Sequence, residues 1–204
     1  MTARRPRRTP VARAGRDPEE TRRALIASGM ELFATRGLDA PSLDDICAHA
    51  GLTRGAFYVH FEDREDFLVA VMDEVGRPLL DRLFAVGAGG FEEAAARFVA
   101  ASASGEYPLM PEGGVRPYQL LDACARSKLL RERYTELVRL ATHRIATLVA
   151  EGQKSGRLRN DVSPQTAATL AIALVVGVQT LADLGMPMKL GALTADVVGL
   201  LQPK

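Results

Sequence analysis

The sequence predicts an all-α fold of about nine helices. No stretch of the 204 residues shows the strict apolar–polar alternation of a half-buried β-strand. Apolar residues instead recur at spacings of three and four along most of the chain, and capping residues and glycines separate the apolar stretches. With 47% hydrophobic and 25% charged residues, the composition is close to the globular average, which argues against a disordered or fibrous chain.

The first helix is expected to begin at Pro18 and to end at Gly37. Asp17 can cap this helix, Pro18 suits the first helical position, and Glu20 is placed to close a capping box. Gly37 is typical of a helix C-terminus, because glycine readily adopts a positive φ.

Two short helices are expected next, one after Ser42 and one from Thr53 to about Phe61. Ser42 and Asp45 stand at the two positions of a capping box, and Thr53 is a further N-cap residue. Helices this short are unstable alone in water, so both must pack on the first helix. Two short helices joined by a tight turn that contains Gly51 are the elements of a helix-turn-helix.

The rest of the chain predicts six further helices. The fourth begins after Asp63, and Gly76 and Pro78 interrupt its apolar pattern, which leaves open one kinked helix or two separate ones. The eighth, capped by Ser163, is apolar nearly all round and must be buried on several sides. The helices after the fourth are expected at about 91–104, 117–126, 128–155, 164–184 and 192–201.

The composition argues against several classes of protein. Cys47 and Cys124 form neither a CxxC pair nor a disulfide framework, and the three histidines show no metal-ligand spacing. No glycine motif that cradles phosphates is present. The longest purely apolar stretch, Leu170 to Val178, is far shorter than the ~20 residues of a membrane-spanning helix. We therefore expect a cytoplasmic protein without metal, cofactor or membrane partner.

The N-terminal segment 1–16 is basic. A segment of this composition cannot form a core, so a flexible arm is expected. Two interpretations remain open: a solubilising tail, or an arm that contacts phosphates or a DNA minor groove. The segment contains no acidic residue, and its arginines are Arg4, Arg5, Arg7, Arg8, Arg13 and Arg16.

The most informative segment is SLDDICAHAGLTRGAFYVHFEDREDF, residues 42–67. A helix that enters the DNA major groove presents the residues of its N-terminal turn to the base edges. Arg54 can bind guanine or phosphate there, and the small Gly55 allows a close approach. Tyr58 and His60 offer donors suited to phosphate oxygens.

This segment resembles the TetR family of bacterial transcriptional regulators. The family's turn, recognition helix and start of the fourth helix match GLTRGAFYVHFEDREDF, and the resemblance covers roughly residues 18–68. A weaker family pattern is EGQKSGRLRND at 151–161. The resemblance implies an all-helical homodimer. Its helix-turn-helix DNA-binding domain would occupy residues 17–62, and a larger ligand-binding and dimerisation domain would occupy residues 63–204.

The resemblance also implies roles for particular residues on DNA. Those at the starts of the second, third and fourth helices would contact bases or phosphates, and Arg64 stands where the family usually has lysine. The implied DNA-binding residues are Ser42, Thr53, Arg54, Gly55, Tyr58, His60 and Arg64.

A ligand cavity is implied among the fifth to eighth helices, and a homodimer interface through the eighth and ninth. An apolar or aromatic small molecule with a few polar groups would suit such a cavity. Without the resemblance, the two last helices could equally be core helices of a monomer. The candidate ligand-binding residues are Phe98, Tyr107, Met110, Tyr118, Leu121, Tyr134, His143 and Gln179.

The leading hypothesis is therefore a transcriptional repressor that a small ligand releases from operator DNA. A redox-responsive regulator is an alternative, in which Cys124 near Arg126 and Lys128 would have a favoured thiolate, whereas Cys47 is expected to be inert core. A helical-bundle enzyme is a remote third hypothesis. No spacing unites its possible acid–base residues Glu31, Asp122, His143 and Glu151.

Overall fold

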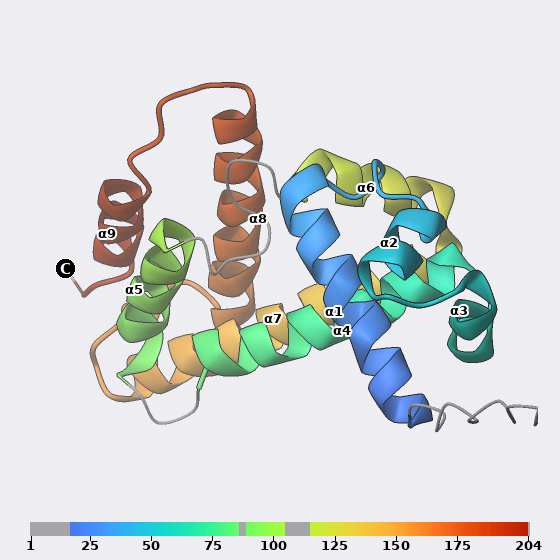
Figure 1. The fold of residues 1–204 in the computed structure, drawn as a ribbon. Helices are drawn as coiled ribbons and strands as arrows, with labels where there is room; N and C mark the ends of the chain where they lie inside the picture. Colours follow the sequence, from blue (N-terminus) through green and yellow to red (C-terminus); the bar gives the residue numbers. More distant parts are fainter. Residues whose placement is uncertain (1–16, 86–88, 105–114, 204) are drawn as a thin grey trace, which may run out of the picture.

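The computed structural model describes residues 17–85, 89–104 and 115–203, and within these ranges all regular secondary structure is α-helical (Figure 1). This confirms the expected all-α fold. The predicted basic arm 1–16 lies outside the described residues, as do Tyr107 and Met110. The helices are α1 (Pro18–Arg36), α2 (Leu43–His49), α3 (Arg54–His60), α4 (Arg64–Leu83), α5 (Gly90–Ala103), α6 (Pro117–Arg126), α7 (Lys128–Lys154), α8 (Pro164–Asp183) and α9 (Leu190–Leu200).

Capping residues set most helix starts where the sequence placed them. Ser42 and Asp45 form the predicted capping box at α2, and the Ser163 side chain caps α8. At α1 the Asp17 carboxylate accepts the backbone N–H of Glu19 at 3.1 Å. The expected box with Glu20 is not the cap that forms.

Helix α4 is one continuous helix that contains Pro78. Of the two arrangements left open by the sequence, a division into two helices is therefore wrong. A Cβ added at Gly76 would lie 2.7 Å from Cδ1 of Leu137 on α7. Gly76 therefore leaves room for Leu137 against α4, and a side chain at this position would displace the end of the Leu137 side chain.

Helices α4 and α7 run side by side along the molecule and join its two ends (Figure 1). One end holds α1, α2, α3 and α6, and the other holds α5, α8 and α9. Each end has its own apolar core. The first centres on Phe57 and Phe67, and the second on Val149 and Ala168.

An aromatic cluster places the start of α4 in the core of the first end. Phe67, on α4, is fully buried, and its ring centroid lies 5.0 Å from that of Phe61 and 5.4 Å from that of Phe57. The ring centroid of Phe33 on α1 lies 6.3 Å from that of Phe67. The three N-terminal helices therefore share their core with the helix that leads into the rest of the chain.

Helices α8 and α9 leave large apolar side chains exposed. Helix α8 is long and apolar enough to cross a membrane by length and composition, although its longest uninterrupted apolar run is short. Such a result for one helix is weak evidence, because a core or interface helix passes the same test. Only 22% of its apolar window is buried within the chain. Leu170, Leu184 and Leu200 expose 62%, 74% and 70% of their surface.

Candidate DNA-binding surface and ligand cavity

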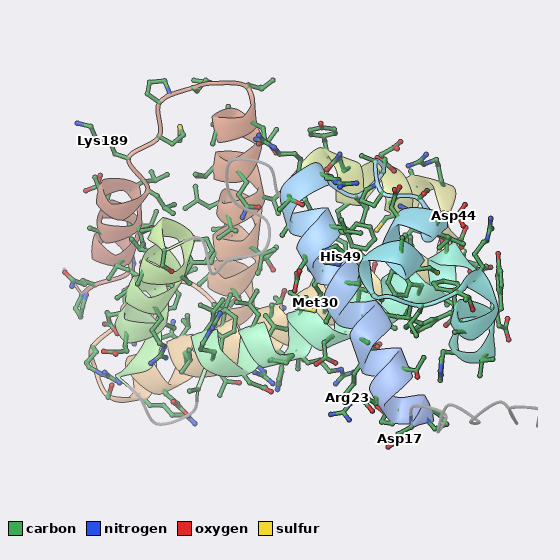
Figure 2. All side chains as sticks on the ribbon, in the orientation of Figure 1. Asp17, Arg23, Met30, Asp44, His49 and Lys189 are labelled. Carbon is green, nitrogen blue, oxygen red and sulfur yellow. The ribbon has the colours of Figure 1, made fainter. Side chains whose placement is uncertain are left out.

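Helix α2 is fixed on α1 by one buried hydroxyl. Ser28 of α1 donates to the backbone carbonyl of Ile46 at 2.9 Å, and its Oγ lies 3.0 Å from Nδ1 of His49. Figure 2 shows His49 on the side of α2 that faces α1, and Asp44 on the outer side. Ile46 and Cys47 are buried below. The short helix is thereby held by tertiary contacts, as its length requires.

Helix α3 buries Phe57 completely and turns its other face outward. Arg54, Gly55, Tyr58 and Val59 are all exposed there. Positions 54 and 58, like 55 and 59, are four residues apart, so these side chains form one continuous surface. We call these four residues the α3 face.

The guanidinium of Arg54 is held over this surface by two partners. It lies 3.4 Å from the carboxylate of Asp44 on α2 and 3.3 Å from the hydroxyl of Tyr58. The hydrogen bond to Tyr58, with the charge of Asp44, raises the pKa of Arg54, which therefore remains cationic. Both partners are exposed, so a phosphate or a base edge can replace them at low cost.

The two N-cap hydroxyls are engaged within the chain. Thr53 Oγ1 accepts the backbone N–H of Ala56 at 3.3 Å. Ser42 Oγ accepts the N–H of Asp45 at 3.1 Å and donates to the Asp45 carboxylate at 2.6 Å. These bonds to Ser42 lower the pKa of Asp45. A phosphate that contacted Ser42 would have to compete with Asp45 for its hydroxyl proton.

Arg64 has a different setting from the one implied by the resemblance. Its guanidinium donates to the carbonyls of Leu38 and Pro41, both at 2.7 Å, and lies 5.8 Å from the ring centroid of Phe33. Burial lowers the pKa of the Arg64 guanidinium. The residue therefore fastens the turn between α1 and α2 to the start of α4. This geometry does not support a phosphate contact by the same donors.

Two further residues complete the description of α3. His60 is half-buried at its end, with its ring centroid 6.4 Å from that of Phe61. Val59 is 75% exposed and was missed by the sequence reasoning. Its position four residues after Gly55 was the available signal, since it places Val59 on the outer face. An exposed valine there is suited to contact a thymine methyl group.

The structure contains two neighbouring cavities. The larger of the two lies among α4, α6, α7 and α8 and has a volume of about 220 Å³. The predicted residues Tyr134 and Gln179 both line it. Burial raises the pKa of the Tyr134 hydroxyl. Gln179 is only 4% exposed, and the rest of the described lining is apolar.

A second cavity of about 150 Å³ lies beside the first, among α4, α5, α7, α8 and α9. The predicted residue Phe98 lines this one. Leu79, Leu80, Ala141, Ile172 and Val175 line both cavities. The two cavities therefore share walls.

Three predicted ligand residues line neither cavity. Tyr118 and Leu121 are 62% and 47% exposed on the outer face of α6, whose inner face presents Leu120 instead. His143 is exposed on α7, two residues after Ala141, which points inward. In each case the helix turns the predicted residue outward, so the structure does not bring it to either of these two cavities.

The two cysteines are buried free thiols, 3% and 6% exposed. Burial raises the pKa of Cys47, and the nearby Asp44 raises it further. Burial also raises the pKa of Cys124, more than the charge of Arg131 lowers it. The expected favoured thiolate at Cys124 is therefore wrong, because loss of water outweighs the neighbouring positive charge.

The possible acid–base residues do not assemble into one site. Glu31 lies 3.6 Å from His49, and Asp122 lies 2.8 Å from Arg126. His143 and Glu151 are separated by two turns of α7. Among the described residues, no group of three or more His, Cys, Asp or Glu side chains could hold a metal ion.

The chain matches the family model described as "Bacterial regulatory proteins, tetR family" over residues 25–71. The HTH-type transcriptional repressor BepR of Brucella suis biovar 1 (strain 1330) is 35% identical over 68 residues, which are 33% of this chain and 32% of BepR. The match thus spans about a third of that relative's length.

Two further similarities extend beyond the helix-turn-helix. A TetR transcriptional regulator from Chloroflexus aurantiacus J-10-FL superimposes with a TM-score of 0.72 and 28% identity, over 91% of this chain and 96% of that one. The HTH-type transcriptional repressor KstR2 of Rhodococcus jostii (strain RHA1) is 30% identical over 153 residues, which are 72% of each chain. Because this identity continues well past residues 25–71, the chain belongs to the TetR family of bacterial regulatory proteins.

Proposed function

We propose that this protein is a DNA-binding transcriptional regulator, a repressor that a small apolar ligand releases from its operator. The observation that carries the proposal is the α3 face, which is exposed to solvent while Phe57, on the opposite side of the same helix, is fully buried. A helix held this firmly by its inner face can present its outer face to the major groove in one orientation.

On the α3 face, Arg54 would bind a guanine or an adjacent phosphate in place of Asp44 and Tyr58. Gly55 would permit the close approach, and Tyr58 would bind the DNA backbone. Thr53 and Ser42 would support the surface mainly as N-caps, given the bonds their hydroxyls already make. His60 would contact phosphate only at the edge of this surface.

We further propose a homodimer through α8 and α9. Leu170 on α8, Leu184 directly after it and Leu200 on α9 are strongly exposed, and a second copy would bury them. Two copies related by a two-fold axis would also present two α3 helices to successive half-sites about one DNA turn apart. Such a protein would act in the cytoplasm and would catalyse no reaction.

The paired cavities provide the place for an effector. They lie between α4, α7 and α8, and α4 also carries Phe67 in the core beneath α3. A ligand that changes how α4 lies on α7 would therefore also change the spacing of the two α3 helices in a dimer. Binding of ligand and binding of operator would then oppose each other.

The first test is binding of the purified protein to DNA taken from immediately upstream of its own gene, against scrambled DNA, at several salt concentrations. Specific binding should weaken about tenfold or more with Arg54→Ala, from the loss of a base or phosphate contact. Arg139→Ala is the matched control, because Arg139 is exposed on α7, away from α3. Equal affinity of Arg54→Ala and wild type for a sequence-specific site would contradict the proposed role of the α3 face.

The dimer is tested by sedimentation. Leu184→Glu places a charge in the proposed interface and should shift the protein toward monomer. Leu129→Glu, at an exposed leucine on α7, should not. A monomeric wild type at micromolar concentration would contradict the dimer.

A further inference from the structure

One buried donor in the larger cavity has no partner. Gln179 lines the cavity and is only 4% exposed. Among the described residues no acceptor lies within hydrogen-bond distance of its Nε2. A buried amide N–H without an acceptor is costly, because it has given up water and gained nothing. Because Nε2 as placed is sealed from the cavity, a ligand that brings an acceptor atom would recover that cost by drawing the Gln179 amide toward it.

The remaining lining defines the rest of the ligand. Within the described residues that line the larger cavity, Tyr134 is the one hydroxyl, and no side chain carries a charge at neutral pH. A carboxylate or an ammonium group would therefore enter without a counter-charge, which is strongly unfavourable in an apolar cavity. The cavity is suited to an uncharged molecule.

The second cavity indicates that the ligand is elongated. It adjoins the larger one through five common wall residues, and its described lining contains Thr194 as the one hydroxyl. Where small movements of these shared wall residues join the two spaces, a molecule anchored at Gln179 would extend past Ala141 and Val175 into the second. The part of the ligand that lies there would be apolar.

We propose that the two cavities together bind an uncharged, elongated and largely apolar molecule whose carbonyl or ether oxygen accepts a hydrogen bond from Nε2 of Gln179. Gln179 would thus select for an oxygen acceptor at one end of the ligand. This inference rests on the proposed function only in taking the cavities as the effector site.

The test is calorimetric titration of the full-length protein, without DNA, using 2-undecanone as the probe. Gln179→Leu should weaken binding about tenfold, because the ketone oxygen then loses water without gaining a donor. The variant should fold normally and unfold at the same or a higher temperature, since it removes an unpaired buried amide. Gln165→Leu is the matched control, because Gln165 is exposed on the same helix. It should bind the ketone as wild type does.

Two further arms test charge and length. Undecanoate and undecylamine, of the same chain length, should bind at least tenfold more weakly than the ketone. Ala95→Leu adds side-chain volume to the second cavity alone, so it should weaken binding of 2-undecanone and leave the shorter 2-heptanone unchanged. Ala95 is half-buried in α5, where leucine is a good helix former.

Three results would overturn the inference: no detectable binding of 2-undecanone, equal binding by Gln179→Leu, or tighter binding of undecanoate. Operator affinity is measured separately with and without the ketone. If the ketone binds as described but operator affinity does not change, the ligand assignment stands and the ligand-released repressor fails. If the ketone lowers operator affinity but Gln179→Leu binds the ketone as wild type does, the ligand-released repressor stands and the role of Gln179 fails.

Discussion

The carboxylate of Asp183, in the last turn of α8, pairs with the guanidinium of Arg116, the residue before α6. The backbone N–H of Arg116 donates to Oε1 of Gln119 at 3.1 Å, and the same oxygen lies 3.5 Å from the N–H of Leu38. A polar connection thus runs from α8, one turn beyond Gln179, to the turn between α1 and α2.

The two members of this ion pair should differ in importance. The Asp183 side chain is 17% exposed and the Arg116 side chain 39%, so an unpaired aspartate would be left in the poorer environment. Arg116→Met should therefore lower the free energy of unfolding by about 1–2 kcal/mol, and Asp183→Asn by less. The measurement is urea unfolding of both variants and of the double variant. The double variant should be no less stable than Arg116→Met, and additive losses would show that the pair does not interact.

Arg64 should matter for stability more than for DNA charge. Arg64→Met leaves the carbonyls of Leu38 and Pro41 without their donors, which should cost about 1–3 kcal/mol of unfolding free energy. Arg64→Lys should recover only part of this loss, because one ammonium group does not reproduce the planar fork of donors.

The salt dependence of operator binding separates this role from a phosphate contact. With Arg64→Lys the slope of log affinity against log salt should equal that of wild type. For Arg64→Met the slope should also be unchanged, even if affinity falls. A slope smaller by about one for Arg64→Met would show that the Arg64 guanidinium does contact phosphate.

The α2 capping box should make stability depend on pH. Hydrogen bonds from Ser42 hold the pKa of Asp45 below its ordinary value in the folded protein. The ionised carboxylate therefore stabilises the fold above the unfolded-state pKa of about 3.9, and this contribution is lost as pH falls through the lower folded-state value. Asp45→Asn should be less stable than wild type near neutral pH, and the difference should shrink as the pH falls below the unfolded-state pKa.

Asp44→Asn is the control for this measurement, since Asp44 is an exposed neighbour in the same turn that pairs with Arg54 and takes no part in the capping box. This variant removes a carboxylate from the same turn and leaves the capping box in place. If the Asp45→Asn difference were constant from neutral to acidic pH, the capping carboxylate would not be the group responsible.

The buried thiols should react slowly with alkylating agents. The thiolate is the reactive form, and burial raises the pKa of both Cys47 and Cys124, so less thiolate exists at neutral pH than in a free thiol. Iodoacetamide should modify the folded protein at least tenfold more slowly than the urea-unfolded protein near pH 7. Cys124→Ser should leave operator binding and its response to oxidant unchanged. Rapid alkylation of folded Cys124 would restore the redox hypothesis.

Local signals predicted most helix boundaries, because capping is a short-range interaction. Ser42 with Asp45 and Ser163 before Pro164 form their caps as the sequence indicated. The continuity of α4 was not decidable in this way. In the folded chain Gly76 packs against Leu137 of α7, a contact between distant parts of the sequence that no local signal reports.

The sequence predicted the positions of some site residues and not of others, for a different reason in each part of the site. The outward position of Arg54 and Tyr58 follows from the buried Phe57 on the same short helix. The carbonyls that hold Arg64 are more than twenty residues away, so only the folded chain shows them. The outward facing of Tyr118 and Leu121 depends on the rotation of α6 about its axis, which packing on α7 and α8 decides.

Gly29 should be needed at the contact between α1 and α4. A Cβ added there would lie 2.5 Å from Cζ of Phe67, which is fully buried and surrounded by other aromatic rings. Gly29→Ala should therefore lower the free energy of unfolding by about 1–3 kcal/mol, despite the better helix propensity of alanine. Gly55→Ala is the matched control within the same end of the molecule. Its nearest atom would be Thr53 Oγ1 at an ordinary 3.6 Å, so stability should rise by up to about 1 kcal/mol.

The cause can be isolated with the double variant Gly29→Ala/Phe67→Leu, measured by urea unfolding beside the single variants. Leucine is smaller at the point where the new methyl group would lie, so the loss in the double variant should be less than the sum of the single losses. Additive losses would mean that the two positions act independently and that the close approach of α4 to α1 does not depend on Gly29. Operator binding by Gly29→Ala should weaken together with its stability, because the same packed aromatic cluster holds α3 in place.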